Sequence, residues 1–381
     1  MKIINIVNSF IGKKGNIGLR TSYIISELNS QKIKNFSYSR GVVKYFEKNN
    51  KNMRIFGHIP RILNAFRIYI NLWFNHRKYD IWFFEKFFFL SYKKSNCENK
   101  IAHVWETSPK IIKKLKNDGF KVVLDLPIAP TATAKGLIDI FGDKIILHPH
   151  EYNDKLERES FILADKIISP SIFVKYELEK IGVDTKKIIV IPFGTDVKNI
   201  ESKIFSKNYE KDGIDFVFAG NINKRKGVDF LLEAWNDDVF RNDRLHLCGR
   251  LYPEVEQLIK KYNLKNIITP GFINTRKYFT KCDVYVFPSL LEGSSKSIYE
   301  AMSASLPCIV TPNSGSVIED CKDGFIIDVA NSNQIKDKMM FFKKNPNMIE
   351  TMGKIARENI YKYTWDNYSK NVIKLYREMN T

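Results

Sequence analysis

The feature that most constrains this chain is the alternation of short apolar runs with helical segments along its second half. Strands that alternate with helices form right-handed βαβ units, in which helices cover both faces of a parallel sheet. The runs are almost continuously apolar, as is typical of strands buried on both faces. We therefore expect an α/β fold with a parallel sheet in this half. The expected strands are Ile214–Gly220, Leu245–Arg250, Ile267–Phe272, Val284–Ser289, Pro307–Pro312 and Gly324–Val329.

The first half of the chain repeats this pattern less regularly. A polar stretch, Asp196–Asp212, follows it and is interpreted as a linker. Because 381 residues exceed one typical hydrophobic core, we expect two parallel-sheet domains. Ligands of such sheets bind at the carboxyl ends of the strands, here in the cleft between the domains. The strands expected in this half are Lys2–Val7, Tyr79–Phe84, Ile101–Trp105, Lys121–Leu126, Lys144–Leu147, Lys166–Ser169 and Lys187–Pro192.

The stretch Pro288–Met302, PSLLEGSSKSIYEAM, joins an expected strand to an amphipathic helix. Free backbone N–H groups at a helix start bind anions, and a glycine there lets the backbone approach the ligand. Glu292 in the loop and Glu300 in the second helical turn would lie on either side of such an anion. Carboxylates accept hydrogen bonds from hydroxyls, so the pattern fits a diphosphate with a sugar on each side. The alternative interpretation is a capped surface helix with solvated glutamates.

A second candidate anion site follows the strand that ends at Gly220. The cluster Lys224, Arg225 and Lys226 precedes a helix. Cations at a helix N-terminus oppose the helix dipole, so this cluster indicates an anionic partner. The alternative is that these side chains are solvated.

Taken together, these segments resemble the GT-B glycosyltransferases of the large family-4 type. The resemblance implies two Rossmann-like parallel-sheet domains that face each other across a cleft. Residues 1–200 would bind the acceptor, with a C-terminal helix in 361–381 packing back on them, and residues 201–360 would bind the nucleotide sugar. The resemblance is faint in residues 30–120. The matching segments are Leu163–Asp196, Phe218–Trp235, Cys282–Ser316 and Asp323–Val329.

The resemblance also implies a role for each matching position. Glu300 would hold the ribose hydroxyls of the donor, and Glu292 those of the transferred sugar. Lys226 would hold the diphosphate, so Glu292 and Lys226 are the predicted catalytic residues. The backbone of Ser294, Ser295 and Lys296 would also contact the diphosphate. The remaining predicted donor-site residues are Gly220, Asn221, Arg225, Gly293, Phe272 and Ile273 beside the base, and Gly15 in a glycine-rich loop across the cleft.

The chain departs from the family pattern at two places. Asn221 stands where the family usually has arginine, and Lys224 or Arg225 is the candidate replacement for that charge. The loop Pro127–Gly136 lacks the histidine that the family often places near the transferred sugar, which leaves His103 or the segment His148–Glu151 as alternatives.

No metal and no cofactor are expected. The sequence contains no Asp-x-Asp motif, and the pair His148 and His150 is expected to be solvated rather than metal-bound. Cationic side chains and helix dipoles would then stabilise the leaving diphosphate.

Charge is concentrated at the N-terminus, where residues 1–100 contain 19 Lys and Arg against 5 Asp and Glu. Such an excess indicates an acidic partner. An anionic membrane surface is the expected one, because no nucleic-acid recognition motif is present. The helix expected at Arg61–Phe74 has an aromatic face that would lie either at a membrane interface or against the sheet.

The sequence begins directly with an expected strand and has no apolar run of membrane-spanning length, so a cytoplasmic, peripheral protein with reduced thiols is expected. The expected function is a retaining, metal-independent hexosyltransferase of polysaccharide or glycoconjugate synthesis. It would use a UDP- or GDP-sugar and a glycan or polyprenyl-linked acceptor. The alternative is a catalytically silent GT-B subunit that scaffolds or activates a partner glycosyltransferase.

Overall fold

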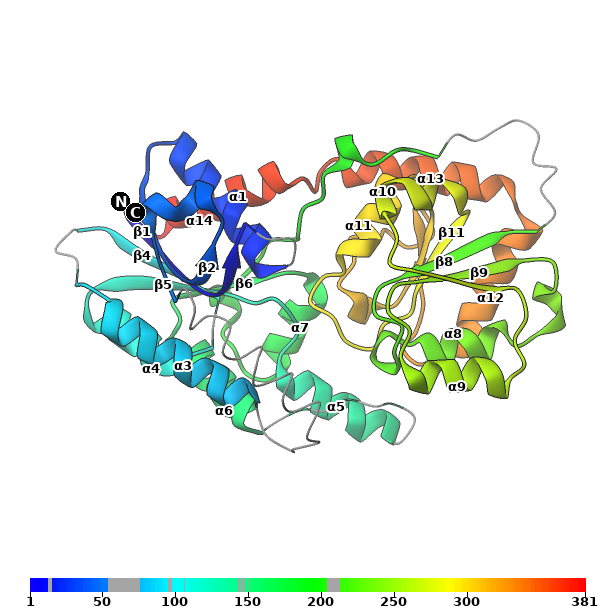
Figure 1. The fold of residues 1–381 in the computed structure, drawn as a ribbon, viewed down its shortest axis with the longest axis horizontal. Coiled ribbons are helices and arrows are strands. Elements are labelled where there is room, and N and C mark those ends of the chain that lie inside the picture. The colour runs from blue at the N-terminus through cyan, green and yellow to red at the C-terminus, as the bar shows by residue number, and fades with distance from the viewer. Residues whose placement is uncertain are drawn as a thin grey trace.

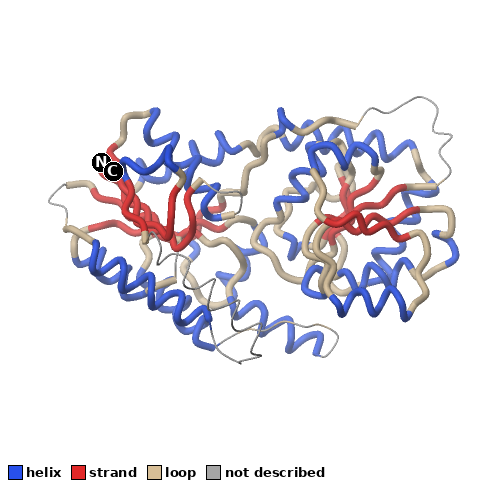
Figure 2. Tube along the Cα trace, in the orientation of Figure 1, coloured by secondary structure: helices blue, strands red, loops and turns tan. Residues whose placement is uncertain are grey.

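The computed structural model describes residues 1–12, 16–53, 76–94, 98–105, 107–142, 145, 147, 149, 151–203 and 213–381. Two parallel sheets lie side by side along the long axis of the molecule, each with helices packed around it (Figures 1 and 2). The chain therefore has an α/β architecture with two parallel sheets, as expected from the alternation of strands and helices.

The first sheet has seven strands in the order β3-β2-β1-β4-β5-β6-β7. Figure 1 shows α1 and the C-terminal helix α14 (Trp365–Glu378) on one side of this sheet and α3, α4 and α6 on the other. Its strands are β1 (Lys2–Ile11), β2 (Lys34–Val42), β3 (Asn50–Asn52), β4 (Lys100–Val104), β5 (Phe120–Asp125), β6 (Lys166–Ser169) and β7 (Ile188–Val190). Its helices are α1 (Ile17–Ser30), α3 (His76–Ser91), α4 (Pro109–Asn117), α5 (Thr131–Phe141), α6 (Glu151–Leu163) and α7 (Ile172–Lys180).

The second sheet has six strands in the order β10-β9-β8-β11-β12-β13, and all six strands expected from the sequence are confirmed. Every residue of β8, β11 and β12 is buried, as in a sheet covered on both faces. The strands are β8 (Asp215–Ala219), β9 (Arg244–Cys248), β10 (Ile267–Gly271), β11 (Val284–Phe287), β12 (Cys308–Val310) and β13 (Gly324–Ile326). Its helices are α8 (Val228–Trp235), α9 (Pro253–Lys261), α10 (Thr275–Tyr278), α11 (Lys296–Ser303), α12 (Ser332–Lys344) and α13 (Asn347–Ile360).

Helix α14 is the last element of the chain, yet it packs against α1 of the first sheet. A buried polar network fixes this contact. The Arg20 guanidinium of α1 lies 2.6 Å from Asp125 Oδ1, and the Tyr368 hydroxyl of α14 donates to Asp125 Oδ2 at 2.9 Å. Because the pair is fully buried, removing one partner would leave an uncompensated charge. This anchor holds Trp365, at the start of α14, between the two sheets.

Four expectations for the first half need correction or comment. Tyr79–Phe84 is part of helix α3 and not a strand, because Ile81, Phe84 and Phe88 are buried at helical spacing. The linker expected at Asp196–Asp212 is not wholly solvated, since Val197 and Ile200 are buried; residues 204–212 lie outside the described residues.

The expected strand Lys144–Leu147 falls mostly outside the described residues, as does the whole of the expected helix Arg61–Phe74. Among the helices that the structure describes, none is both long enough and apolar enough to cross a bilayer. The described cysteines are unpaired thiols: Cys248, Cys282 and Cys308 are buried and Cys321 is exposed.

Candidate functional site

A cavity of about 460 Å³ opens at the carboxyl ends of the strands of the second sheet. It lies where β8 and β11 are neighbours and the strand order reverses, which is the place where parallel α/β sheets bind ligands. Residues associated with the first sheet and with α14 close its other side. The cavity is lined by Asn16, Phe193, Ala219, Gly220, Asn221, Arg225, Lys226, Cys248, Gly249, Phe272, Ile273, Thr275, Glu292, Ser294, Ser295, Lys296, Ser297, Glu300 and Trp365.

Most of the residues predicted from the sequence line this one cavity, although they come from three separate segments. Gly293 is not among the lining residues, and Gly15 lies outside the described residues, where its neighbour Asn16 does line the cavity. The predicted residues in the lining are Gly220, Asn221, Arg225, Lys226, Phe272, Ile273, Glu292, Ser294, Ser295, Lys296 and Glu300.

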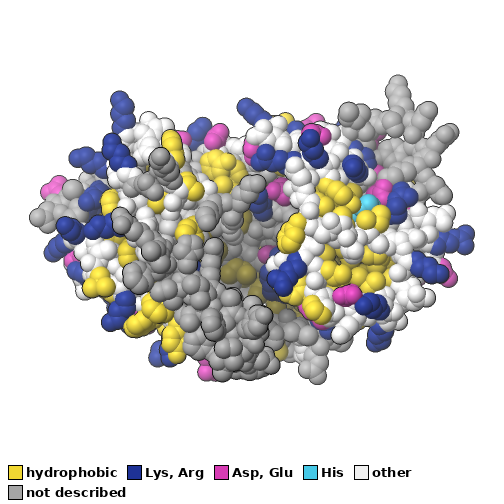
Figure 3. All heavy atoms as spheres, in the orientation of Figure 1, with side chains coloured by type: hydrophobic (Ala, Val, Ile, Leu, Met, Phe, Trp, Pro, Cys, Tyr) yellow, Lys and Arg dark blue, Asp and Glu magenta, His cyan; other side chains and the backbone are white. Residues whose placement is uncertain are grey.

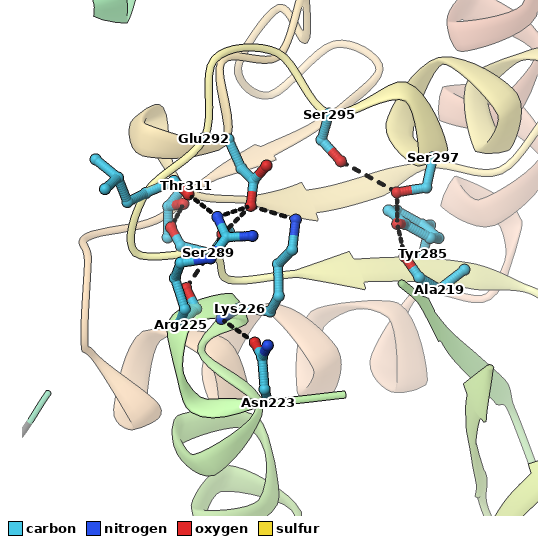
Figure 4. Close-up of polar contacts among 11 residues, drawn as sticks. Ala219, Asn223, Arg225, Lys226, Tyr285, Ser289, Glu292, Ser295, Ser297 and Thr311 are labelled. Carbon is cyan, nitrogen blue, oxygen red and sulfur yellow. Dashed lines mark hydrogen bonds and ion pairs between the residues drawn. The ribbon is translucent and has the colours of Figure 1, made fainter. Parts of the chain in front are cut away.

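Two cations converge on one carboxylate oxygen at this site (Figure 4). Arg225 Nη1 lies 2.8 Å from Glu292 Oε1, and Lys226 Nζ pairs with the same oxygen. The Ser289 hydroxyl donates to that oxygen at 3.1 Å. The guanidinium also donates to the Leu291 carbonyl at 2.5 Å. Glu292 is therefore held in place by the turn that follows β8 and by Ser289 in the loop after β11.

A tight turn explains how adjacent cations reach this position. Lys224–Lys226 forms a single 3₁₀ turn, in which the Asn223 side chain accepts from the Lys226 backbone N–H at 3.3 Å. The turn ends at Gly227 with φ +67°, and a Cβ there would lie 1.9 Å from the Pro288 carbonyl oxygen. Glycine thus permits the turn to pack directly against the loop after β11.

Burial shapes the electrostatics of the pair. Burial lowers the pKa of Lys226; the Glu292 carboxylate opposes this shift, and the Arg225 charge adds to it. Lys226 Nζ also lies 5.0 Å from the centroid of the Phe287 ring. Two cations share one carboxylate in a partly desolvated site, so this end of the cavity favours an additional anion.

The start of α11 presents hydroxyl groups to the cavity. The Tyr285 hydroxyl lies 2.7 Å from Ser297 Oγ, which lies 3.1 Å from Ser295 Oγ (Figure 4). The Ser294 hydroxyl instead lies 2.9 Å from the Tyr299 hydroxyl. The backbone N–H of Ser295 already donates to the Ser314 carbonyl at 3.1 Å, so its hydroxyl is the group offered to a ligand in this conformation.

Glu300 occupies a different part of the cavity from Glu292. Its Oε1 lies 3.0 Å from Lys296 Nζ, and its Oε2 accepts from the Thr275 hydroxyl at 3.0 Å. Thr275 begins α10, just after the loop that carries Phe272, whose side chain is 85% exposed. The two glutamates therefore have separate partners within the cavity.

Gly293 has a different structural role from the one expected. A Cβ on Gly293 would lie 2.4 Å from the Pro127 carbonyl oxygen of the first domain. Its own carbonyl accepts from the Ser171 hydroxyl at 2.7 Å, and the Glu292 carbonyl accepts from the Ala129 N–H at 3.3 Å. Glycine is needed here for close contact between the domains, and that contact braces the loop that carries Glu292.

The structure shows where the residues at the two departures from the family pattern lie relative to the cavity. Asn221 lines the cavity without a charge, and Arg225 supplies a guanidinium in the same cavity. His103 is buried, with Nδ1 2.6 Å from the Tyr376 hydroxyl, and is not among the lining residues. His148 and His150 lie outside the described residues. Within the described part of the chain, no three His, Cys, Asp or Glu side chains gather as a metal site would require.

Several lining residues were not identified from the sequence. Asn16 and Ser297 directly follow predicted residues, and Thr275 lies two residues after Ile273, so adjacency was an available signal. Phe193 and Trp365 carried no local signal, because the chain brings them together only where it crosses between the domains. A Cβ on Gly194 would lie 2.5 Å from the Trp365 nitrogen, which shows how tight this crossing is.

Comparison with known proteins agrees with this geometry. Residues 199–359 match the family model described as glycosyl transferases group 1. An uncharacterized glycosyltransferase of Methanocaldococcus jannaschii is 28% identical over 223 residues, which is 57% of this chain and 60% of that protein. The N-acetylgalactosamine-N,N'-diacetylbacillosaminyl-diphospho-undecaprenol 4-alpha-N-acetylgalactosaminyltransferase of Campylobacter jejuni is 26% identical over 166 residues, 42% of this chain and 45% of that protein. The chain thus spans roughly half of these two relatives.

Solved structures match over the whole chain. Sucrose-phosphate synthase from Thermosynechococcus elongatus superposes with a TM-score of 0.70 at 17% identity, covering 100% of this chain and 99% of that one. Anabaena Alr3699/HepE in complex with UDP and glucose superposes with a TM-score of 0.65 at 14% identity, covering 99% and 100%. At such identities the likeness concerns the fold, which is GT-B over both domains.

Proposed function

Because residues 199–359 match the group 1 glycosyl transferase model and the chain has a GT-B fold, we propose that this protein is a retaining glycosyltransferase that uses a nucleotide sugar. The observation that carries the proposal is the convergence of Arg225 and Lys226 on one oxygen of Glu292 inside the cavity. A diphosphate is the ligand that best matches two adjacent cations.

Donor binding would redistribute these contacts. The diphosphate oxygens take the place of the Glu292 carboxylate beside Arg225 and Lys226. Glu292 is then available to accept hydrogen bonds from hydroxyls of the transferred sugar. Glu300 accepts from the ribose hydroxyls on the other side, near the exposed Phe272 ring at the base end of the cavity.

The same cations would stabilise the leaving group. The bond between the anomeric carbon and the phosphate oxygen breaks, and negative charge develops on the nucleoside diphosphate. Arg225 and Lys226 stabilise that charge where it forms. The acceptor hydroxyl attacks from the face that the nucleotide leaves and transfers its proton to the departing phosphate, which retains the anomeric configuration. We propose that no metal is needed, because the chain supplies the counter-charges itself.

The proposed donor is a UDP-sugar, with a GDP-sugar as the second choice. UDP is supported by the structural similarity to HepE, which is described in complex with UDP and glucose. The proposed acceptor is a glycan or a polyprenyl-linked sugar in polysaccharide or glycoconjugate synthesis. The Campylobacter relative, whose name contains diphospho-undecaprenol, supports a lipid-linked acceptor. Such an acceptor fits a cytoplasmic enzyme at an anionic membrane surface, a location that the basic N-terminal region also favours.

Calorimetric titration with UDP, GDP and their sugar conjugates tests the proposal. We expect the wild-type protein to bind at least one of these nucleotides and its sugar conjugate. On turnover with an acceptor, it should release the free nucleoside diphosphate. Arg225→Ala should weaken UDP binding by about ten- to a hundredfold, since a hydrogen bond to a charged group contributes roughly 1.5–3 kcal/mol.

Lys224→Ala is the matched control, because Lys224 lies in the same turn but is not among the residues that line the cavity. Asn221→Arg in the Arg225→Ala background should restore part of the affinity. If the wild-type protein neither binds nor turns over any nucleotide sugar, the proposed enzymatic function is refuted. The alternative, a catalytically silent GT-B subunit that scaffolds a partner enzyme, would then remain.

A further inference from the structure

Helix α3 presents an aromatic and basic face to solvent. Trp82, Lys86 and Phe89 follow one another at helical spacing on this face, and Lys93 continues it just past the end of the helix. Trp82 is 45% exposed, Phe89 44% and the adjacent Leu90 88%. Large apolar side chains that are exposed together on one helix indicate an interaction surface.

The opposite side of the helix is firmly attached to the first domain. Ile81, Phe84 and Phe88 are fully or almost fully buried in the core below the sheet. The Phe88 ring also packs 4.9 Å from that of Tyr92. The exposed residues are therefore carried by a fixed helix and do not depend on a loosely attached segment.

The two carboxylates of α3 lie away from its basic face. Asp80 pairs with Arg40, and the two side chains are only 13% and 12% exposed. Glu85 is buried, accepts from the Ser108 hydroxyl at 2.6 Å and pairs with Lys110 at 3.3 Å. Both negative charges are thus neutralised within the fold, and the outward face keeps only its lysines.

We propose that this outward face of α3, made by Trp82, Lys86, Phe89, Leu90 and Lys93, docks the protein on an anionic lipid surface. Aromatic and aliphatic side chains interleaved with lysine are typical of helices that lie in the membrane interface. Lysine can extend its charged end to the headgroups while its stem covers apolar surface, and Lys86 Nζ already lies 5.8 Å from the Trp82 ring centroid.

The surrounding surface carries the same kind of charge. Figure 3 shows hydrophobic and basic side chains intermixed on the half of the molecule where Figure 1 places α3 and α4. The first 100 residues hold 19 Lys and Arg against 5 Asp and Glu. An excess of positive charge of this size complements an anionic bilayer, because the negative surface potential attracts each lysine side chain. This docking face would bring the protein to a lipid-linked acceptor, and in that respect it rests on the proposed function.

Vesicle co-sedimentation of the full-length protein tests the proposal. Wild type should bind phosphatidylcholine vesicles that contain phosphatidylglycerol, bind pure phosphatidylcholine vesicles much less, and dissociate as salt screens the charges. Lys86→Glu should weaken binding by at least about fivefold, the effect of one cation near the surface. Trp82→Ala with Leu90→Ser should weaken it by roughly tenfold to a hundredfold, since two buried apolar side chains are lost.

Matched substitutions on the second domain serve as controls. Ile268→Ser removes a half-exposed apolar side chain from β10, and Lys265→Glu reverses a surface charge beside it. Both should bind vesicles like wild type. The proposal is overturned if wild type ignores the anionic vesicles, which would leave the face to a protein partner, or if the α3 variants bind as well as the controls.

Nucleotide titration of the same variants separates this proposal from the proposed function. The α3 variants should keep wild-type UDP affinity, which would also show that they are folded. Vesicle binding without any nucleotide binding would contradict the proposed glycosyltransferase function but not the docking face. Nucleotide binding without vesicle binding would contradict the docking face but not the proposed glycosyltransferase function.

Discussion

Replacing Glu292 with glutamine should strengthen the binding of UDP, although Glu292 is proposed to act in the reaction. Its Oε1 lies 2.8 Å from Arg225 Nη1 and pairs with Lys226 Nζ. In the proposed exchange, the diphosphate takes the place of the carboxylate beside these cations. Glutamine keeps the size and one acceptor oxygen but removes the negative charge, so both cations become more available.

The size of the effect follows from what the carboxylate contributes. A hydrogen bond to a charged group is worth roughly 1.5–3 kcal/mol, and a neutral one roughly 0.5–1.5 kcal/mol. The substitution therefore removes about 1–2 kcal/mol of competition, or about a five- to thirtyfold gain in UDP affinity. Burial already lowers the pKa of Lys226, and loss of Glu292 should lower it further. The gain should thus be greatest at low pH and shrink as Lys226 loses its proton with rising pH.

Calorimetry with UDP and with a UDP-sugar measures both consequences. UDP should bind more tightly, whereas the preference for the UDP-sugar over UDP should fall, because glutamine is a weaker acceptor for sugar hydroxyls. Glu300→Gln is the contrasting variant and should weaken both ligands, since the ribose is common to them. A folded Glu292→Gln protein whose UDP affinity is unchanged or lower would refute the exchange of partners.

Three further predictions concern stability and metal dependence. Gly293→Ala should lower the free energy of unfolding by about 1–3 kcal/mol in thermal or urea denaturation, because the added Cβ would meet the Pro127 carbonyl at 2.4 Å; wild-type stability would contradict the close contact. Burial raises the pKa of Asp229 to about 6, so its contribution to stability is present at pH below 3.8 and is lost as pH rises through about 6. Asp229→Asn should consequently raise the melting temperature at pH 8 by more than at pH 5, and an equal effect at both would exclude the shift. Excess EDTA should leave UDP binding and turnover unchanged, and a large loss would show that the side-chain cations are insufficient.

The sequence predicted the second sheet well because its central strands β8, β11 and β12 are buried on both faces and therefore read as continuous apolar runs. The first sheet was harder, since β2 buries polar residues. Its Ser37 accepts from the Asn5 side chain at 3.3 Å, and its Ser39 donates to the Asn50 side chain at 2.9 Å. These polar pairs are made between neighbouring strands and leave no local pattern of hydrophobicity. The aromatic residues of α3 led to a wrong prediction of a strand at Tyr79–Phe84, because aromatic residues are common in strands.

The site was predictable to the extent that its residues share a loop or a strand end. Glu292 and Glu300 and the cationic turn were recognisable by spacing, because a strand end followed by a helix start defines where side chains point. Trp365 was not recognisable in this way. It lines the cavity only because the buried Arg20, Asp125 and Tyr368 network holds α14 on the first domain, and no local sequence feature reports that contact.

The pair Arg225 and Lys226 gives the cavity positive charge although Asn221 stands where the family usually has arginine. Asn221 and Arg225 line the same cavity, although they are separated along the chain by the start of a 3₁₀ turn. The turn ends at Gly227 and packs on the Pro288 carbonyl, which brings the Arg225 guanidinium back to the loop after β11. Arginine stays charged at any physiological pH, whereas burial lowers the pKa of Lys226. Position in space, rather than position in the sequence, thus determines which residue can balance the charge of a bound anion.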